Sequence, residues 1–267
     1  MDLTFTKWVG AGNDFILVDW RRKKNLPVNR WSALAKNLCR QKVGIGADGI
    51  LVLESSKGAD FRMRIFNPDG SEAEMCGNGS RCVAAYAARG RKKDVAFDTV
   101  AGRLEARIRG DVVRVKLSPP HSLKTGVSLE VEGKNLELHT ITAGVPHAII
   151  FVDALDKIDV EGLGEKIRNH PYFQPKGTNV DFVKVEGSNR IAIRTYERGV
   201  EGETLACGTG GTASALMTAF LKGFSSPIEV LTKGGDRLKI FFKGDQFEEV
   251  HLEGKVSCLF EGRVKDV

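Results

Sequence analysis

The sequence is poor in cysteine, and the cysteines it has are not spaced as disulfide or redox pairs. Only five occur among 267 residues, an odd number, and no two form a C-x-x-C motif. Disulfide scaffolds are therefore excluded, and we expect reduced thiols in a cytoplasmic protein. The first residues, MDLTFTKWVG, also lack the apolar region of a signal peptide.

Long hydrophobic runs are also lacking. No stretch approaches the roughly 20 apolar residues that a membrane helix needs, so we expect no membrane partner. Proline is scarce, with 8 residues, while 42% of the chain is apolar and 28% is charged. This composition excludes disordered and collagenous chains, and the length suits one large or two medium domains.

The excess of positive charge is small, with a formal net charge of +6. The densest basic runs, Arg21–Lys24 and Arg91–Lys93, are short and lack the interleaved aromatic residues that stacking on bases requires. We interpret them as solvated surface and expect no nucleic-acid partner. Nucleic-acid binding stays the less favoured alternative.

The two halves of the chain resemble each other. Each begins with a small turn that opens into an apolar strand, and two further strand-like segments follow in each half. The matched pairs are Ala11–Asp19 with Ala143–Asp153, Asp48–Glu54 with Asp181–Glu186, and Phe61–Phe66 with Ile191–Tyr196.

Each half then carries Cys-Gly-x-Gly followed by a helical run, at Cys76 and at Cys207. The runs stop at Gly90 and Gly223, as glycine C-caps favour. Gly12 precedes Cys76 by 64 residues and Gly144 precedes Cys207 by 63. The repeat predicts an α+β fold of two pseudo-symmetric homologous domains, each a mostly antiparallel sheet wrapped around a central helix.

Pro119-Pro120 marks the predicted domain boundary, because neither residue can donate a backbone hydrogen bond to a strand. We expect a first domain of residues 1–118 that carries Cys76 and a second domain of residues 119–254 that carries Cys207. The strand-like C-terminal segment 255–267 is expected to return to the first domain.

A cysteine in a glycine-rich turn just before a helix has a specific chemistry. The unpaired amides and partial positive charge of the helix start stabilise a thiolate, and the same amides bind a carboxylate. A single such cysteine is more often a small buried side chain. Its appearance at equivalent places in both halves favours function for Cys76 and Cys207, whereas Cys39, Cys82 and Cys258 lack this setting.

Two such thiols suit three kinds of chemistry. Metal binding is disfavoured because the five histidines show no ligand spacing, so we expect no metal. A thiol-disulfide oxidoreductase stays open as an alternative, although the usual C-x-x-C is missing. In acid/base catalysis, one thiolate removes a proton from a carbon and the opposite thiol protonates the other face.

The segment Gly44–Gly49 matches a dinucleotide fingerprint in letters only. The strand-like ILVLE follows it, whereas a true fingerprint opens a helix. We therefore expect no nicotinamide or flavin cofactor.

The motifs resemble those of the diaminopimelate epimerase family over nearly the whole chain. They are Gly12-Asn13-Asp14-Phe15, Gly44–Asp48, Asn67–Glu72, Met75–Gly79, Pro146-His147, Asn179, Glu197–Gly199 and Glu203–Gly210. The resemblance implies a cofactor-independent isomerase that interconverts LL- and meso-diaminopimelate in lysine and peptidoglycan-precursor biosynthesis. It also implies a homodimer.

The resemblance also implies roles for individual residues. Cys76 and Cys207 are the two acid/base thiols, and His147 and Glu197 tune them and receive the amino group. The remaining implied substrate ligands fall into two groups: the helix-start residues Gly77, Asn78, Gly208 and Thr209, which hold the reactive-centre carboxylate, and Asn13, Asn67, Asn179 and Arg198, which bind the rest of the substrate.

Two positions depart from the family pattern. Val145 stands where many members have Asn before Pro-His, and Gly49 stands where some have Gln. The first change removes a side chain that helps to hold the distal amino acid. A racemase of another amino acid on the same fold is therefore an alternative.

Overall fold

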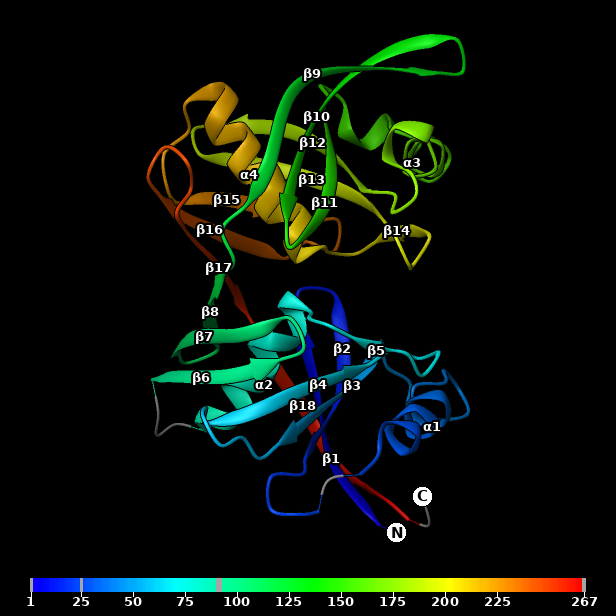
Figure 1. The fold of residues 1–267 in the computed structure, drawn as a ribbon, viewed down its shortest axis with the longest axis vertical. Helices are drawn as coiled ribbons and strands as arrows, with labels where there is room; N and C mark the ends of the chain where they lie inside the picture. The colour runs from blue at the N-terminus through cyan, green and yellow to red at the C-terminus, as the bar shows by residue number, and fades with distance from the viewer. Residues whose placement is uncertain (1, 25, 90–92, 266–267) are drawn as a thin grey trace. The chain divides into compact units, whose positions relative to one another are not determined.

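The computed structural model describes residues 2–24, 26–89 and 93–265 (Figure 1). These residues fold into two compact units, the first running up to Val115 and resuming at Gly254, the second running from Lys116 to Glu253. Gly90, Arg91 and Lys92, which the sequence assigned to a helix stop and a basic run, lie outside the described residues.

The first unit is a mostly antiparallel sheet with two helices. Its strands are β1 (Leu3–Gly10), β2 (Asn13–Asp19), β3 (Gly49–Glu54), β4 (Phe61–Phe66), β5 (Glu72–Ala73), β6 (Asp94–Thr99), β7 (Gly102–Arg109), β8 (Val112–Leu117) and β18 (Ser257–Val264), and its helices are α1 (Val28–Leu38) and α2 (Gly77–Ala88). Hydrogen bonds join β18–β1–β2–β3–β4–β6–β7–β8, with β5 paired to β4. Among the described strands of this unit, only β2–β3 and β4–β6 pair in parallel.

The second unit has the same organisation. Its strands are β9 (His121–Val131), β10 (Lys134–Ala143), β11 (Val145–Phe151), β12 (Asn179–Gly187), β13 (Arg190–Glu197), β14 (Gly202–Thr204), β15 (Ile228–Leu231), β16 (Arg237–Lys243) and β17 (Glu249–Lys255), with helices α3 (Val160–Arg168) and α4 (Gly208–Lys222) and short turns η1 (Leu155–Lys157) and η2 (Pro171–Phe173). They pair as β9–β10–β11–β12–β13–β15–β16–β17, with β14 on β13. The parallel pairs, β11–β12 and β13–β15, are the counterparts of those in the first unit. The predicted pseudo-symmetric α+β fold is thus confirmed.

The hydrogen-bond register corrects one detail of the predicted repeat. Phe15 lies opposite Gly49 in the first unit, and His147 lies opposite Asn179 in the second. The counterpart of Asp181 is therefore Leu51, and the predicted match of Asp48–Glu54 with Asp181–Glu186 was wrong by three residues. The letter match failed because both strands are short apolar runs, in which alternation does not fix the register.

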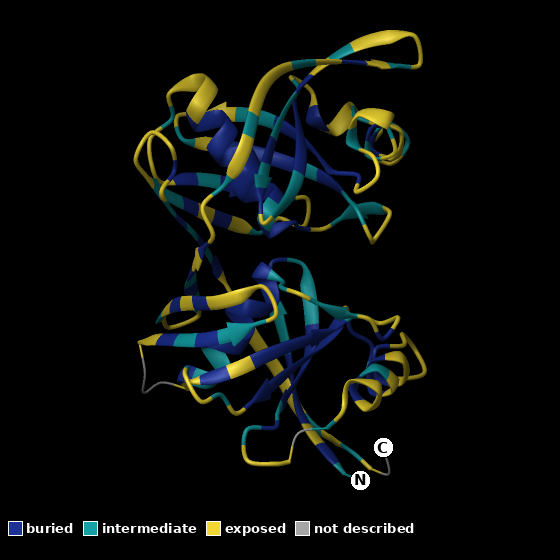
Figure 2. Ribbon diagram, viewed as in Figure 1, coloured by how far each residue is buried: buried dark blue, intermediate teal, exposed yellow. Residues whose placement is uncertain are grey.

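One helix in each unit is surrounded by strands and the other lies on the outside (Figure 1). Helix α4 contacts strands β10 to β13, β15 and β16, and every residue from Gly210 to Ala219 is buried (Figure 2). Helix α2 is likewise buried from Gly77 to Ala84. Both helices therefore lie in the core of their unit, as the sequence predicted, although α2 also buries the polar side chains of Asn78, Ser80 and Arg81.

The outer helices cover the other face of each sheet. In the first unit, Trp31 of α1 is fully buried against strand residues that include Ile16 and Ile50. In the second, Val160 and Ile167 of α3 pack with Val180 and Phe182. Alternate residues of β3 and β12, Leu51 and Asp181, therefore face the inner helices.

A partly buried arginine–glutamate pair occurs at the same place in both units. Arg64 Nε and Nη2 donate to Glu72 over 2.7 and 2.9 Å, and Arg194 Nε and Nη2 donate to Glu203 over 2.6 and 2.8 Å. Each pair ties a central strand to the short strand that precedes a cysteine-bearing turn. Such bidentate pairs fix geometry as well as adding attraction.

Helix α4 ends at Gly223 in the left-handed conformation, with φ of 67°, as its sequence predicted. Among the described residues, no helix combines the length and apolar character needed to cross a membrane.

Arg64 generates a prediction about stability. It also pairs with Glu54 at 3.3 Å, and both residues are buried. Arg64→Met should lower the free energy of unfolding by about 3–5 kcal/mol because it leaves a buried carboxylate without its cation. Urea denaturation measures the loss, and adding Glu54→Leu should recover part of it.

The exposed Lys166, which pairs with Glu132, supplies the control. Lys166→Met should leave the urea midpoint nearly unchanged. Equal losses in Arg64→Met and Lys166→Met would contradict the importance of burial.

Candidate active site

The two candidate thiols are N-caps of the inner helices. Cys76 precedes α2 and Cys207 precedes α4, both in extended backbone conformation. The amide of Gly79 donates to Cys76 Sγ over 3.5 Å, and that of Gly210 donates to Cys207 Sγ over 3.3 Å. Each sulfur thus accepts from the positive end of a helix, which favours its thiolate form.

The third helical residue is glycine in both units, and a side chain there would displace a neighbour. A Cβ on Gly79 would press on Leu51 Cδ2, and a Cβ on Gly210 would collide with Asp181 Oδ1. In the first unit the neighbour is therefore apolar, and in the second it is a carboxylate.

Asn13 and Asn78 lie together beside the α2 start. Asn78 Nδ2 donates to Asn13 Oδ1 over 2.7 Å, and Asn13 Nδ2 donates to Asp48 Oδ2 over 2.9 Å. The fully buried Arg81 donates to Asn78 Oδ1 over 2.7 Å. A chain of hydrogen bonds from Arg81 to Asp48 therefore fixes both predicted ligands in place.

Asn67 lies in the turn between β4 and β5. Its amide Nδ2 donates to Ser71 Oγ over 3.0 Å. Its counterpart in the second unit is Glu197, the last residue of β13. The two units thus place different polar groups at one position of the fold.

Cys207 has a carboxylate and a hydroxyl as neighbours. Its thiol hydrogen-bonds to Glu197, whose Oε1 accepts from Thr204 Oγ1 over 2.5 Å, and Thr209 Oγ1 lies 3.4 Å from Cys207 Sγ. Gly208, which opens α4, and Thr209 supply amides at the same helix start. A thiol and a carboxylate in contact share protons readily.

Burial and charge set the protonation of this pair. Burial raises the pKa of the Cys207 thiol well above its usual range, the negative charges of Glu197 and Asp181 raise it further, and the Thr209 hydroxyl and Gly210 amide oppose them. Burial also raises the pKa of the Glu197 carboxyl, against the lowering effect of its Thr204 hydrogen bond. Cys207 is therefore a protonated thiol at neutral pH.

His147 lies on β11, in the same unit as Cys207. We call the polar residues around each cysteine a half-site. Its Nδ1 is 2.7 Å from Asp181 Oδ2, and Thr195 Oγ1 donates to Asp181 Oδ1 over 2.7 Å. All three side chains are buried. Their counterparts in the first unit are Phe15, Leu51 and Ile65.

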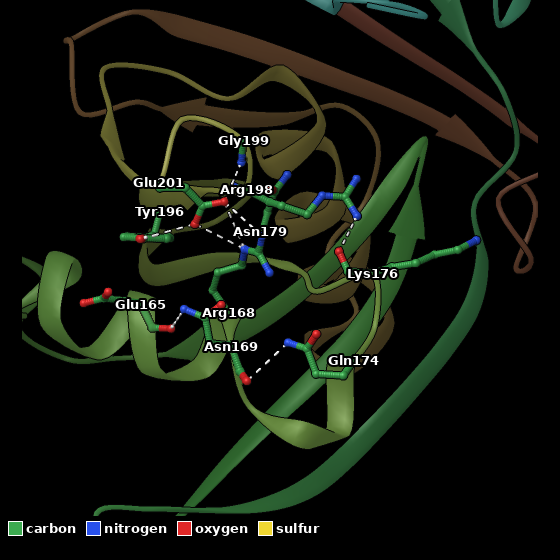
Figure 3. A network of polar contacts seen from close by, with 10 residues as sticks. All are labelled: Glu165, Arg168, Asn169, Gln174, Lys176, Asn179, Tyr196, Arg198, Gly199 and Glu201. Carbon is green, nitrogen blue, oxygen red and sulfur yellow. Dashed lines mark hydrogen bonds and ion pairs between the residues drawn. The ribbon is translucent and has the colours of Figure 1, made fainter.

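Asn179 and Arg198 meet at the loop that follows β13 (Figure 3). Asn179 Oδ1 accepts from the Arg198 amide over 2.8 Å, and Arg198 Nη1 donates to the Lys176 carbonyl over 2.9 Å. Arg198 therefore keeps other guanidinium N–H groups available for a ligand.

A second set of contacts holds this loop. Glu201 accepts from Arg168 Nη2 over 2.9 Å and from the Gly199 amide over 3.0 Å, and Tyr196 also donates to it (Figure 3). Arg168 also packs against Gly177, where a Cβ would meet its guanidinium. The loop that carries Arg198 is thus tied to the end of α3.

Sequence reasoning missed the hydrogen-bonding partners that hold the predicted residues and their loop in place. They are Asp181, Thr195 and Thr204 in the second unit, Asp48 and Arg81 in the first, and the Arg168–Glu201 pair. For Asp181 a signal existed: an acidic residue inside the apolar run Val180–Val183 has to find a partner.

The described residues include no group of three or more His, Cys, Asp or Glu side chains placed to hold a metal ion. None of the five cysteines is in a disulfide. What each half-site offers is a thiol, helix-start amides and neighbouring polar side chains, which suits proton transfer beside a bound carboxylate.

Comparison with known proteins agrees with this chemistry. A family model described as diaminopimelate epimerase matches residues 5–122 and 139–259. A diaminopimelate epimerase of Hydrogenobaculum sp. (strain Y04AAS1) is 44% identical, over 97% of this chain and 98% of the relative. One of Aquifex aeolicus (strain VF5) is 42% identical, over 99% and 98%.

Solved structures share the fold at much lower identity. A phenazine biosynthesis protein of the PhzF family from Bacillus anthracis has a TM-score of 0.76 at 17% identity, and the match covers 99% of each chain. A probable proline racemase from Agrobacterium radiobacter K84 has a TM-score of 0.71 at 16% identity, covering 98% of this chain and 92% of that one. These likenesses show the two-unit fold.

The contact between Cys207 and Glu197 generates a prediction about ionisation. In Glu197→Gln, the pKa of the Cys207 thiol should fall, because a neighbouring negative charge that disfavours the thiolate is removed. A pH titration of the ¹³Cβ resonance of Cys207 in cysteine-labelled protein measures it. Cys258, which is exposed on β18, should titrate as before, and an unchanged or higher pKa for Cys207 would contradict the arrangement.

Proposed function

Since the chain belongs to the diaminopimelate epimerase family and is an isomerase, we propose that it interconverts LL- and meso-diaminopimelate through Cys76 and Cys207. The observation that carries the proposal is an arrangement found in both units. In each, the cysteine sulfur accepts a hydrogen bond from the amide of the third residue of a buried helix. An epimerase must act on both faces of one carbon, and two equivalent thiols supply one group for each face.

In the proposed reaction, the Cys76 thiolate removes the α proton, so that the C–H bond breaks and an S–H bond forms. The Cys207 thiol then gives its proton to the opposite face of the carbon, and the reverse reaction exchanges the roles. Cys207 begins as the acid because burial and the neighbouring carboxylates keep it protonated. Glu197, whose pKa burial raises, accepts a proton from Cys207 when Cys207 must act as the base.

The helix-start amides hold the carboxylate next to the reacting carbon. Gly77 and Asn78 of α2, and Gly208 and Thr209 of α4, supply the first amides of their helices. Amides aimed at a carboxylate also stabilise the negative charge that develops as the proton leaves. We assign reception of the α-amino group to His147 and Glu197.

We assign the distal amino-acid end of the substrate to Asn13, Asn67, Asn179 and Arg198. Arg198 is held through its backbone amide by Asn179, and its planar guanidinium offers two parallel donors to a carboxylate. Val145, which replaces the Asn of many family members, is accommodated because the other polar ligands remain.

We further propose that the enzyme is a cytoplasmic homodimer that needs no cofactor and binds neither nucleic acid nor membrane. All five cysteines are free thiols, which suits a reducing compartment. Arg21, in the basic run, is paired with Asp19, which leaves less charge for phosphates. Leu259 and Phe260 are exposed on β18, and a second copy would cover apolar surface of this kind.

The two-thiol mechanism predicts the effect of removing either thiol. Cys76→Ala and Cys207→Ala should each lower kcat for epimerisation by a factor of about 10²–10⁴ or more, the usual contribution of a general acid or base. Chiral chromatography of LL- and meso-diaminopimelate measures turnover, and circular dichroism should show an unchanged fold. Cys258→Ala is the control and should retain full activity, whereas full turnover in either of the first two variants would contradict the mechanism.

Arg198 tests the distal-end assignment. Arg198→Lys replaces a planar fork with a point charge, so kcat/KM for diaminopimelate should fall about 5- to 150-fold, or about 1–3 kcal/mol. The wild type should prefer diaminopimelate over alanine, histidine and proline. A preference for one of these simpler amino acids would favour the racemase alternative and overturn the assignment.

A further inference from the structure

We propose that Asp181 is a positioning residue that holds the His147 imidazole with its proton on Nδ1 and its Nε2 lone pair free for proton transfer. The inference deepens the proposed function, because it concerns the same half-site. It rests on hydrogen bonds, burial and the comparison of the two units.

The hydrogen bonds around Asp181 favour one arrangement of protons. An ionised carboxylate only accepts, so Oδ1 takes the Thr195 hydroxyl proton and Oδ2 takes a proton from His147 Nδ1. The Nδ1 atom therefore carries hydrogen. This fixes both the tautomer and the rotation of the ring.

The other ring nitrogen points to a function. His147 Nε2 is buried and has no hydrogen-bond partner among the described residues. A buried polar atom is costly to leave unpaired, so the unpaired Nε2 of His147 calls for an explanation. An orphaned Nε2 opposite a fixed Nδ1–H is the arrangement of a histidine that exchanges protons with another group.

The start of α4 stabilises the Asp181 charge. Asp181 Oδ1 occupies the space where a side chain on Gly210 would begin, so the carboxylate lies against the first turn of the helix. The partial positive charge there favours an anion, which offsets the cost of burying it. Gly210 is glycine because any side chain would displace Asp181.

The first unit shows that the fold does not need this group. At the same positions it has Phe15, Leu51 and Ile65, and Leu51 packs against Gly79 as Asp181 packs against Gly210. An apolar trio fills the same space without buried charge. The polar trio in the second unit is therefore explained by chemistry that only that unit performs.

The direct test observes the His147 ring without substrate. ¹⁵N NMR of histidine-labelled protein, assigned by comparison with His147→Gln, should show a protonated Nδ1 and an unprotonated Nε2 in the wild type. In Asp181→Asn the amide side chain also offers a donor to Nδ1, so the proton should move to Nε2 or exchange between the two nitrogens. A wild-type proton on Nε2, or an unchanged spectrum in Asp181→Asn, would overturn the inference.

Kinetics supplies the second readout. Asp181→Asn should lower kcat by a factor of about 10²–10⁴ with little change in KM, since a wrong tautomer impairs proton transfer more than binding. Thr195→Val removes only the hydroxyl that orients the carboxylate, and its kcat should fall about 2- to 12-fold. A change confined to KM would overturn the positioning role.

A control separates positioning from loss of stability. Asp159 caps α3 in the same unit, where its side chain accepts from the Gly162 amide. Asp159→Ala should lower the thermal midpoint but leave kcat and the His147 spectrum unchanged. An equal fall of kcat in Asp159→Ala would assign the effect of Asp181→Asn to stability. The NMR result needs no turnover, so it stands or fails independently of the substrate assignment.

Discussion

A hydrogen bond from the start of a buried helix to a cysteine sulfur constrains much of this structure, and it occurs once in each unit. The sulfur must lie at the N-cap, so the chain turns sharply from a short strand into the helix, and the third helical residue is a glycine packed closely against a strand side chain. Strands surround the helix, so most of its residues are buried. The duplicated Arg64–Glu72 and Arg194–Glu203 pairs tie the short strand before each cysteine to the sheet. They therefore fix the position of the turn that carries the cysteine.

The duplicated fold carries unequal chemistry. Around Cys207 the inward side chains are polar and buried, and they include two carboxylates within electrostatic range of the thiol. The equivalent positions in the first unit are mainly apolar. In a duplicated protein whose reaction needs an acid and a base, this inequality keeps the Cys207 thiol protonated, as an acid must be. The two halves can therefore keep one backbone plan and still take different parts in the reaction.

The sequence predicted the repeated sheet, the inner helices and the place of the two cysteines at the helix starts, because these depend on local patterns: alternation in strands, glycine at helix ends and a duplicated Cys-Gly-x-Gly turn. It failed at Asp181. Matching by letters paired Asp48 with Asp181, whereas the hydrogen-bonded register pairs Leu51 with it. Strand register depends on partners distant in the chain, so a short apolar segment does not reveal it.

For the same reason, the sequence did not reveal the hydrogen bonds that position the predicted substrate ligands. Arg198 is positioned by Asn179 and by the Lys176 carbonyl, about 20 residues earlier, and its loop is tied to Arg168 by Glu201. From the composition of the turn alone, Arg198 would be predicted to be an ordinary surface arginine. Long-range hydrogen bonds of this kind appear only once the strands have been placed.

The most direct test of the central claim, that separate thiols remove and supply the proton, is early deuterium incorporation in D₂O. With LL-diaminopimelate as substrate, mass spectrometry of both isomers at low conversion measures the label at the α carbon. If two separate groups remove and supply the proton, the meso product carries solvent deuterium while the recovered LL substrate keeps its original hydrogen. Deuterium entering the recovered substrate as fast as the product would mean that a single group serves both faces, and it would contradict the account.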